Sequence, residues 1–328
     1  MASGMLSLGS VIGSGSYGVV YRGSLLTADT ETSMPRQSAV AVKALGAGVA
    51  GGATREALAE IRLHRTARHE SVVGLLAAFS HNGCDFLVLE LCELGSIADI
   101  ISQRGAPLTE PQIAAVCCGA LHGLQVSRCT PTLCLLPALC DQCSSMRVPQ
   151  HLHYACGLIH RDVKGGNLLL TADFTVKLAD FGIALELELD QQGAMQSRCG
   201  TVIGSPLYMA PELIEHGEVP LALLLNSSQL HVADTQPDAS IPLQASRVID
   251  VWALGITAIE MAETRPPHSA MHPPIHAMYK IVRDPPPGLA RPDLWTGGFI
   301  DFVGACLQKI PGEREHASDL NRCPTRVL

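Results

Sequence analysis

The chain has 328 residues, of which 16% are charged, and its formal net charge is −8. This length allows one large domain or two lobes around a substantial core. The acidic balance argues against nucleic-acid binding, which needs clustered lysine and arginine. The N-terminal segment MASGMLSLGS has neither the basic residues nor the apolar run of a secretory signal. No apolar run reaches the roughly 20 residues of a membrane span. We therefore expect a soluble, cytoplasmic protein.

The first ninety residues show patterns that are typical of strands. Residues 8–21 alternate apolar and small side chains around glycines, which predicts a strand, a turn and a second strand. The polar segment 23–38 predicts a loop. Short apolar runs predict further strands, and one segment has apolar residues at helical spacing. The predicted strands cover 39–45, 72–79 and 85–91, and the predicted helix covers 54–68.

Helical patterns dominate after Cys92. Residues 95–105 and 110–125 have the composition of helices, and Pro111 suits a first helical turn. Residues 245–263 form a long apolar segment that predicts a buried central helix. A small β-rich unit is therefore expected to precede a larger helical one, with a boundary near residues 90–95.

Three glycines near the N-terminus have the spacing of a phosphate-binding loop. Gly13, Gly15 and Gly18 fit the pattern G-x-G-x-x-G, and backbone amides approach phosphates closely where no side chain intervenes. The pattern alone is weak, because a plain glycine hairpin or a dinucleotide-binding turn has the same spacing. A dinucleotide-binding turn needs a helix after the third glycine, whereas the VVY segment that follows here favours a strand.

A lysine stands near the end of the next predicted strand. Lys43 would place a cation beside bound phosphates, and Glu60 on the predicted helix could hold its ammonium group in an ion pair. Both residues also have an ordinary interpretation, because strands often end in lysine and a solvated glutamate needs no partner.

The segment HRDVKGGN at 160–167 is the strongest functional signal. Asp162 can accept a proton from an attacking hydroxyl group, Lys164 can stabilise a transferred group, and Asn167 can bind a metal through its amide oxygen. Asp180 follows in a DFG motif, and its carboxylate suits Mg²⁺, which prefers oxygen ligands. The order of all these motifs along one chain outweighs the ordinary interpretation of each motif taken singly.

With these motifs in this order, the sequence resembles the eukaryotic protein kinases from about Leu8 to about Leu320. The resemblance implies a two-lobed α+β fold, with a β-rich N-lobe at 1–91 and a mainly helical C-lobe at 92–328. HRDVK and GSPLYMAPE are similar to the serine/threonine branch. ELGSIADII and DVWALGITAIEMAE resemble the Sterile-20 group, nearest to the Hippo/MST kinases, which implies a place in a signalling cascade.

The resemblance also implies a reaction and a set of site residues. The γ-phosphoryl group of ATP would pass, with Mg²⁺, to serine or threonine hydroxyl groups of protein substrates. Asp162, Lys164 and Asn167 would be catalytic, and Asn167 and Asp180 would hold Mg²⁺. The residues expected to bind the nucleotide are Ile12, Gly13, Gly15, Gly18, Val20, Ala41, Lys43, Glu60, Leu89, Glu90, Cys92 and Leu169.

Regulation is expected at the loop before the APE motif. Thr201 resembles the family's activating phosphosite, phosphorylated by an upstream kinase or by a second copy of the chain. Arg161, beside Asp162, could bind the phosphate and order this loop. Ser205 stands where the family has a serine or threonine near the substrate groove.

Three further residues are expected to have structural roles. Glu212 is expected to form a buried ion pair with Arg314, and Asp250 to hold the backbone of the catalytic loop. His64 departs from the family, which commonly has an apolar residue at this position, one turn after Glu60. A neutral histidine fits there but could weaken the active alignment.

Two segments, 126–150 and 219–244, interrupt the family pattern. Each begins with valine and ends with glutamine, whose codons can supply the GT and AG ends of an intron, so both could be retained introns translated in frame. The alternative is a pair of genuine loops. The three prolines of the first segment cannot continue a helix, so this segment must loop out. If it cannot, the chain would be an inactive product, and a kinase-like scaffold without activity is a further alternative.

The twelve cysteines are spaced too irregularly for a disulfide framework. Cys140 and Cys143 form a C-x-x-C pair within the first interrupting segment. This pair permits a zinc or redox site, but a plain pair of reduced thiols is the commoner case.

Overall fold

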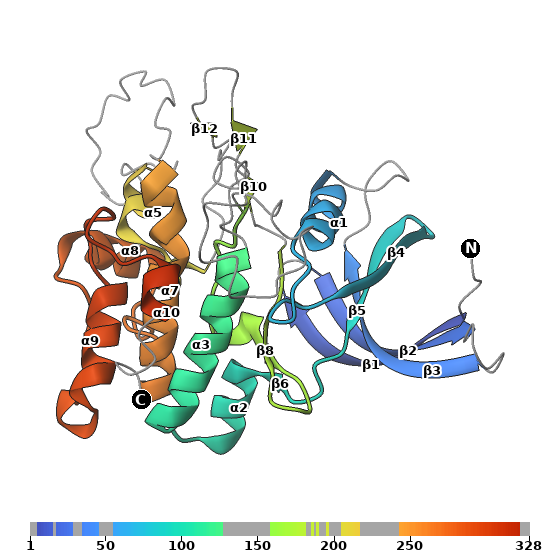
Figure 1. Ribbon diagram of the computed structural model, residues 1–328, viewed down its shortest axis with the longest axis horizontal. Helices are drawn as coiled ribbons and strands as arrows, with labels where there is room; N and C mark the ends of the chain where they lie inside the picture. Colours follow the sequence, from blue (N-terminus) through green and yellow to red (C-terminus); the bar gives the residue numbers. More distant parts are fainter. Residues whose placement is uncertain are drawn as a thin grey trace, which may run out of the picture.

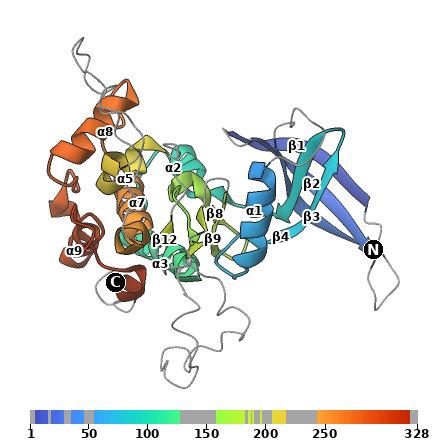
Figure 2. The same ribbon diagram turned by 90° about the horizontal axis from the view of Figure 1, so that it is seen from above.

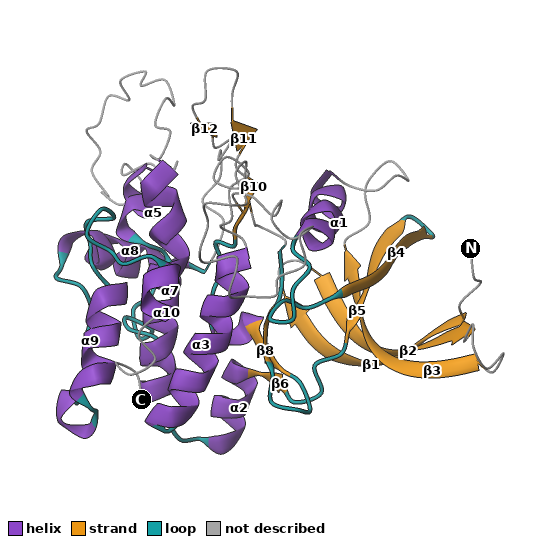
Figure 3. Ribbon diagram, in the orientation of Figure 1, coloured by secondary structure: helices purple, strands orange, loops and turns teal. Residues whose placement is uncertain are grey.

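A computed structural model of the chain places a β-sheet at one end of the molecule and a group of helices at the other (Figures 1 and 3). It describes residues 5–15, 18–28, 35–45, 55–126, 158–181, 185–186, 188–189, 195–196, 205–216 and 243–321. The expected α+β organisation, a β-rich part followed by a helical part, is confirmed. Both interrupting segments, 126–150 and 219–244, lie outside these residues except at their ends.

The N-terminal part is a five-stranded antiparallel sheet with the strand order β1-β2-β3-β5-β4. One face buries Val40, Val42 and Val88. The other buries Leu45 and Leu87, against which helix α1 packs. The strands are β1 (Met5–Gly15), β2 (Gly18–Ala28), β3 (Pro35–Leu45), β4 (Leu75–His81) and β5 (Cys84–Glu90), and α1 is Arg55–Thr66.

The loop expected at 23–38 was wrong. Strand β2 continues to Ala28 and β3 already begins at Pro35, with ten paired positions between them. The polar composition suggested a loop, but Leu25 packs against the valine cluster of the sheet. A proline at the first position of a strand is compatible with pairing. Pairing with β3 therefore outweighs the weak local preference of this segment.

The C-terminal part is built around one buried helix, α7 (Leu243–Glu263) (Figure 2). Val251, Trp252 and Leu254 on it are fully buried, as expected for a helix that is apolar on all sides. At Gly255 an added Cβ would lie 2.6 Å from the Cβ of Cys306, so glycine lets α9 approach closely. The other helices are α2 (Ile97–Arg104), α3 (Glu110–Val126), α5 (Pro211–His216), α8 (Pro274–Arg283), α9 (Gly297–Cys306) and α10 (Ala317–Asn321).

Short strands flank the HRD and DFG motifs. Strands β6 (Gly95–Ser96), β8 (Leu168–Leu170) and β9 (Val176–Leu178) form one small sheet. Strand β7 (Leu158–Ile159) pairs with β10 (Leu185–Glu186), and β11 (Glu188–Leu189) pairs with β12 (Met195–Gln196). The HRD segment therefore follows β7, and the DFG segment lies between β9 and β10. No helix in the described part of the chain is both long and apolar enough to cross a membrane.

A buried ion pair joins two distant segments of the helical part. Both guanidinium ends of Arg314 donate to the Glu212 carboxylate, at 2.6 and 3.0 Å, and neither side chain is more than 5% exposed. Arg314 also donates to backbone oxygens of Gln308 and Val248 and lies over the ring of Trp252. The ion pair predicted from the sequence is thus confirmed.

Replacing Arg314 with alanine should lower the free energy of unfolding by about 3–5 kcal/mol, because the Glu212 carboxylate would stay buried without a partner. Urea denaturation followed by tryptophan fluorescence measures this change. Arg291→Ala is the matched control, because its pair with Asp293 is well exposed and should contribute nothing measurable. Equal effects of the two substitutions would contradict the role given to the buried pair.

Candidate active site

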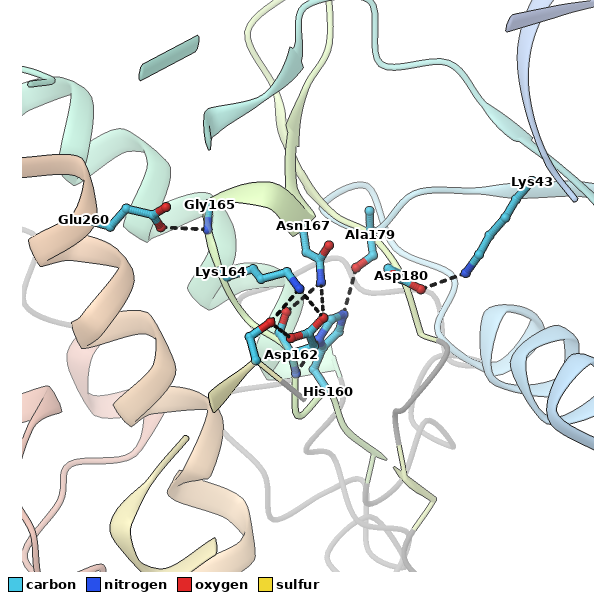
Figure 4. Close-up of polar contacts among 10 residues, drawn as sticks. Lys43, His160, Asp162, Lys164, Gly165, Asn167, Ala179, Asp180 and Glu260 are labelled. Atoms are coloured by element: carbon cyan, nitrogen blue, oxygen red, sulfur yellow. Dashed lines mark hydrogen bonds and ion pairs between the residues drawn. The ribbon is translucent and has the colours of Figure 1, made fainter. Parts of the chain in front are cut away.

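The first feature of the site is a buried lysine held by two carboxylates. The ammonium group of Lys43, on β3, lies 2.7 Å from the carboxylate of Glu60 on α1. It also lies 2.8 Å from the carboxylate of Asp180 (Figure 4). Burial works to lower the pKa of Lys43, but the charges of Asp180 and Glu60 outweigh burial and raise this pKa above its ordinary value. The ammonium group therefore stays charged at neutral pH and joins the sheet, α1 and the DFG segment.

Helix α7 holds the segment that begins with HRD through two carboxylates. Asp250 accepts hydrogen bonds from the backbone N–H groups of His160, at 3.0 Å, and Arg161, at 2.8 Å. Glu260, near the C-terminal end of the same helix, accepts a hydrogen bond from the N–H of Gly165 at 3.1 Å (Figure 4). The structure thus places Asp250 as the sequence predicted. Both ends of the loop are held by carboxylates on the most deeply buried helix.

His160 links the HRD segment to the DFG segment. Its Nε2 donates to the carbonyl oxygen of Ala179 at 3.0 Å, and its Nδ1 accepts the N–H of Asp162 at 3.3 Å. Burial lowers the pKa of His160, which agrees with a neutral ring carrying its proton on Nε2. The residue before Asp180 is therefore fixed relative to Asp162.

The carboxylate of Asp162 is the centre of a group of polar side chains. Its Oδ2 accepts from Lys164 Nζ at 2.7 Å and from Asn167 Nδ2 at 2.8 Å, and its Oδ1 accepts from Ser205 Oγ at 2.9 Å. Lys164 also donates to Ser205 Oγ at 2.7 Å. Only 3% of Asp162 is exposed. The group combines a proton acceptor, a cation and a hydroxyl at one point.

Asn167 and Asp180 have the chemistry of a Mg²⁺ site. The amide nitrogen of Asn167 donates to Asp162, and Figure 4 shows the amide oxygen turned away from it. The carboxylate of Asp180 is the second oxygen donor. No group of three or more His, Cys, Asp or Glu side chains in the described ranges could hold a metal by itself. The two residues therefore fit a cation that takes its remaining oxygen ligands from phosphates and water, as Mg²⁺ commonly does.

Two residues beside these groups have left-handed backbone, Arg161 with φ 67° and Asp180 with φ 65°. This conformation is uncommon outside glycine. Backbone strain of this kind is concentrated at functional sites, where the surrounding structure imposes it. Here the bonds to Asp250 and the ion pair with Lys43 supply that restraint.

Four of the predicted nucleotide-binding residues share one face of the sheet. Val20 pairs with Lys43, Ala41 lies two residues before Lys43, and Leu89 pairs with Ala41. Because side chains alternate along a strand, all four point to the same side. Leu89 is also next to Glu90, the last residue of β5, so this face reaches the start of the segment that leads to α2.

The remaining predicted nucleotide-binding residues are distributed around this face. Ile12 is 47% exposed and Cys92 is 8% exposed. Gly15 and Gly18 close the β1–β2 hairpin, and at Gly18 an added Cβ would lie 2.1 Å from the carbonyl oxygen of Ala44. The others are Gly13 on β1, Glu60 on α1, Glu90 at the end of β5 and Leu169 on β8. Thr201, the predicted phosphosite, lies outside the described residues.

The sequence analysis did not predict two residues that make contacts at the candidate site. Lys177 on β9 forms an ion pair of 2.6 Å with Glu90, and no spacing rule connects the two. Glu260 was read only as part of an apolar helix. An acidic residue within such a helix must be buried and partnered, so its position in the sequence was a signal that could have been used.

The comparison with known families agrees with this geometry. A family model described as protein tyrosine and serine/threonine kinase matches residues 6–323, almost the whole chain. The antiparallel sheet and the helical part correspond to the N-lobe and C-lobe of the two-lobed protein kinase fold. The chain belongs to the protein tyrosine and serine/threonine kinase family.

Proposed function

We propose that this kinase transfers the γ-phosphoryl group of ATP to serine and threonine hydroxyl groups of proteins. The observation that carries the proposal is the group around Asp162, in which Lys164 and Ser205 both contact the carboxylate. We assign residues 1–91 to the N-lobe and 92–328 to the C-lobe, because β5 ends at Glu90 and α2 begins at Ile97.

The nucleotide is proposed to bind between the sheet and β8. Adenine lies under Val20 and Ala41, with Leu169 on the other side and the backbone near Cys92 at its edge. The glycine hairpin covers the phosphates, and Lys43 binds the α- and β-phosphates while Glu60 holds its ammonium group. The pairing of Val20 with Lys43 supports this arrangement, because it fixes the distance between an adenine contact and a phosphate contact.

Asn167 and Asp180 are proposed to hold Mg²⁺ on the phosphates. The cation neutralises phosphate charge and orients the γ-phosphoryl group. Asp180 contacts Lys43 in the structure. When the nucleotide binds, the Asp180 carboxylate would turn toward Mg²⁺ and the Lys43 ammonium group would turn toward the phosphates.

The acceptor hydroxyl is proposed to take the place of the Ser205 hydroxyl beside Asp162 Oδ1. Asp162 orients this hydroxyl and takes its proton, while Lys164 stabilises the charge on the transferred group. The position of Lys164, two residues after Asp162 and bonded to it, supports a serine/threonine preference, since it is the HRDVK feature similar to that branch. The resemblance to the Sterile-20 and Hippo/MST kinases supports the proposal that this reaction belongs to a signalling cascade.

Regulation is proposed through phosphorylation of Thr201. Arg161 supports this role, because its Nε is buried and has no hydrogen-bond partner among the described residues. A phosphate would supply that partner and order the loop before Ser205. The modifying enzyme is an upstream kinase or a second copy of this chain.

Incubation with Mg²⁺, labelled ATP and a generic protein substrate should give phosphoserine and phosphothreonine, resolved by phosphoamino-acid analysis. Asp162→Asn should lower kcat by a factor of roughly 10² to 10⁴, because the proton acceptor is lost. ATP affinity measured by calorimetry should stay within about twofold, since Asp162 does not contact the nucleotide in this proposal. Phosphotyrosine as the main product would overturn the serine/threonine assignment, and an unchanged rate would overturn the role of Asp162.

Thr201→Ala should lower the activity of the fully phosphorylated enzyme by roughly ten- to hundredfold, the size of one lost charge-assisted hydrogen bond. The phosphorylation state of each sample is checked by mass spectrometry. In an Arg161→Ala background the same substitution should have little further effect, because both changes remove one contact. Additive losses in the double variant would show that Arg161 does not read the phosphate.

A further inference from the structure

A row of three rings connects α1 with the catalytic loop. The rings of His64 and Phe181 form a T-shaped pair, with 4.9 Å between their centroids and 69° between their planes. The rings of Phe181 and His160 form a second such pair, with a centroid distance of 5.0 Å and an interplanar angle of 65°. Phe181 follows Asp180, and His64 is one turn after Glu60. The row therefore runs beside the ion pairs of Lys43.

His64 is a polar side chain in an apolar place. It is 3% exposed, and its neighbours Leu63, Ala67 and Phe181 belong to one buried apolar group. Neither ring nitrogen has a hydrogen-bond partner in the part of the chain that the structure describes. The backbone of Val73 lies close enough to the ring to raise the pKa of His64, although no contact with it meets the geometry of a hydrogen bond.

The ring of His64 is neutral. Burial, and then the charge of Lys43, lower the pKa of His64 to about 4, while Asp180 acts in the opposite direction and His160 also lowers it. A neutral imidazole still carries one donor and one acceptor. Burying both without partners is unfavourable relative to their exposure to water.

The unfavourable burial applies only while α1 is docked. If α1 moves outward, the His64 nitrogens reach water, but Glu60 leaves Lys43 and the Phe181 ring loses its neighbour. Phosphoryl transfer needs the docked position of α1. The burial of His64 thus opposes this position. A leucine or methionine would fill similar volume without polar atoms.

We propose that His64 is a positioning residue that acts through Phe181 and destabilises the aligned state of this kinase, which keeps its basal activity low. The proposal rests on the proposed function. A ligand or modification that stabilises the docked α1 would then raise the activity by shifting this population.

His64→Leu and His64→Met in the full chain test the proposal. Each should raise basal kcat/KM for Mg·ATP by about tenfold, equal to about 1.4 kcal/mol. Arg65→Leu is the matched control, because Arg65 is the next residue of α1 and is exposed; it should leave kcat/KM unchanged. Unchanged or lower activity in both folded His64 variants would overturn the proposal.

A double-mutant cycle tests whether His64 acts through Phe181. In a Phe181→Leu background, the gain from His64→Leu should fall below about twofold, because the ring contact is already removed. A gain that persists in full would overturn the coupling.

Amide hydrogen exchange supplies a readout that does not depend on phosphoryl transfer. In the absence of nucleotide, residues 60–66 should exchange about tenfold more slowly in His64→Leu than in the native chain. If no variant transfers phosphate but this slowing occurs, the proposed function fails and the role of His64 stands. Equal exchange in the native and variant chains would overturn the role of His64.

Discussion

The buried ammonium group of Lys43 is the constraint on which the site depends. A charge in this position is tolerated only with partners, and two carboxylates that contact it come from α1 and from the DFG segment, 17 and 137 positions away along the chain. Satisfying one cation therefore requires the sheet, α1 and the C-lobe to meet. Loss of either carboxylate would remove one of the contacts that hold the charge and would release one of these segments from it.

The C-lobe supplies the matching rigid side of the site. Helix α7 is buried from Val248 to Ala262, and Asp250 and Glu260 on it hold the backbone of the catalytic loop at its two ends. Asp162 is therefore positioned by a helix whose described side chains are almost all buried. Lys43 and Asp162 thus belong to two separately supported halves, and the rings of His160, Phe181 and His64 lie between them.

The sequence predicted the two-lobed fold and named most residues of the candidate site, because the motifs are rigidly spaced. HRDVKGGN places Asp162, Lys164 and Asn167 on one loop, so their proximity is a local property. The contact of Ser205 with Asp162 spans 43 positions, and the pair of Lys177 with Glu90 joins two strands that no local pattern connects. Such contacts are set by tertiary packing, which a single sequence does not display.

The wrong prediction for 23–38 and the incomplete interpretation of His64 have one cause, which is that the local sequence does not show tertiary packing. Polar composition described the local preference of 23–38, whereas pairing with β3 decided its structure. The sequence identified His64 as unusual, but only its burial among Leu63, Ala67 and Phe181 shows that both nitrogens lose water. The sequence shows which residues are unusual, and packing decides whether each of them stabilises or destabilises the structure.

A crystal structure with Mg²⁺ and a non-hydrolysable ATP analogue tests the central claim most directly. We expect the nucleotide between the sheet and β8, the cation bound to the Asn167 amide oxygen and the Asp180 carboxylate, and Lys43 on the phosphates while still paired with Glu60. A nucleotide bound elsewhere, or a cation that contacts neither Asn167 nor Asp180, would contradict the account.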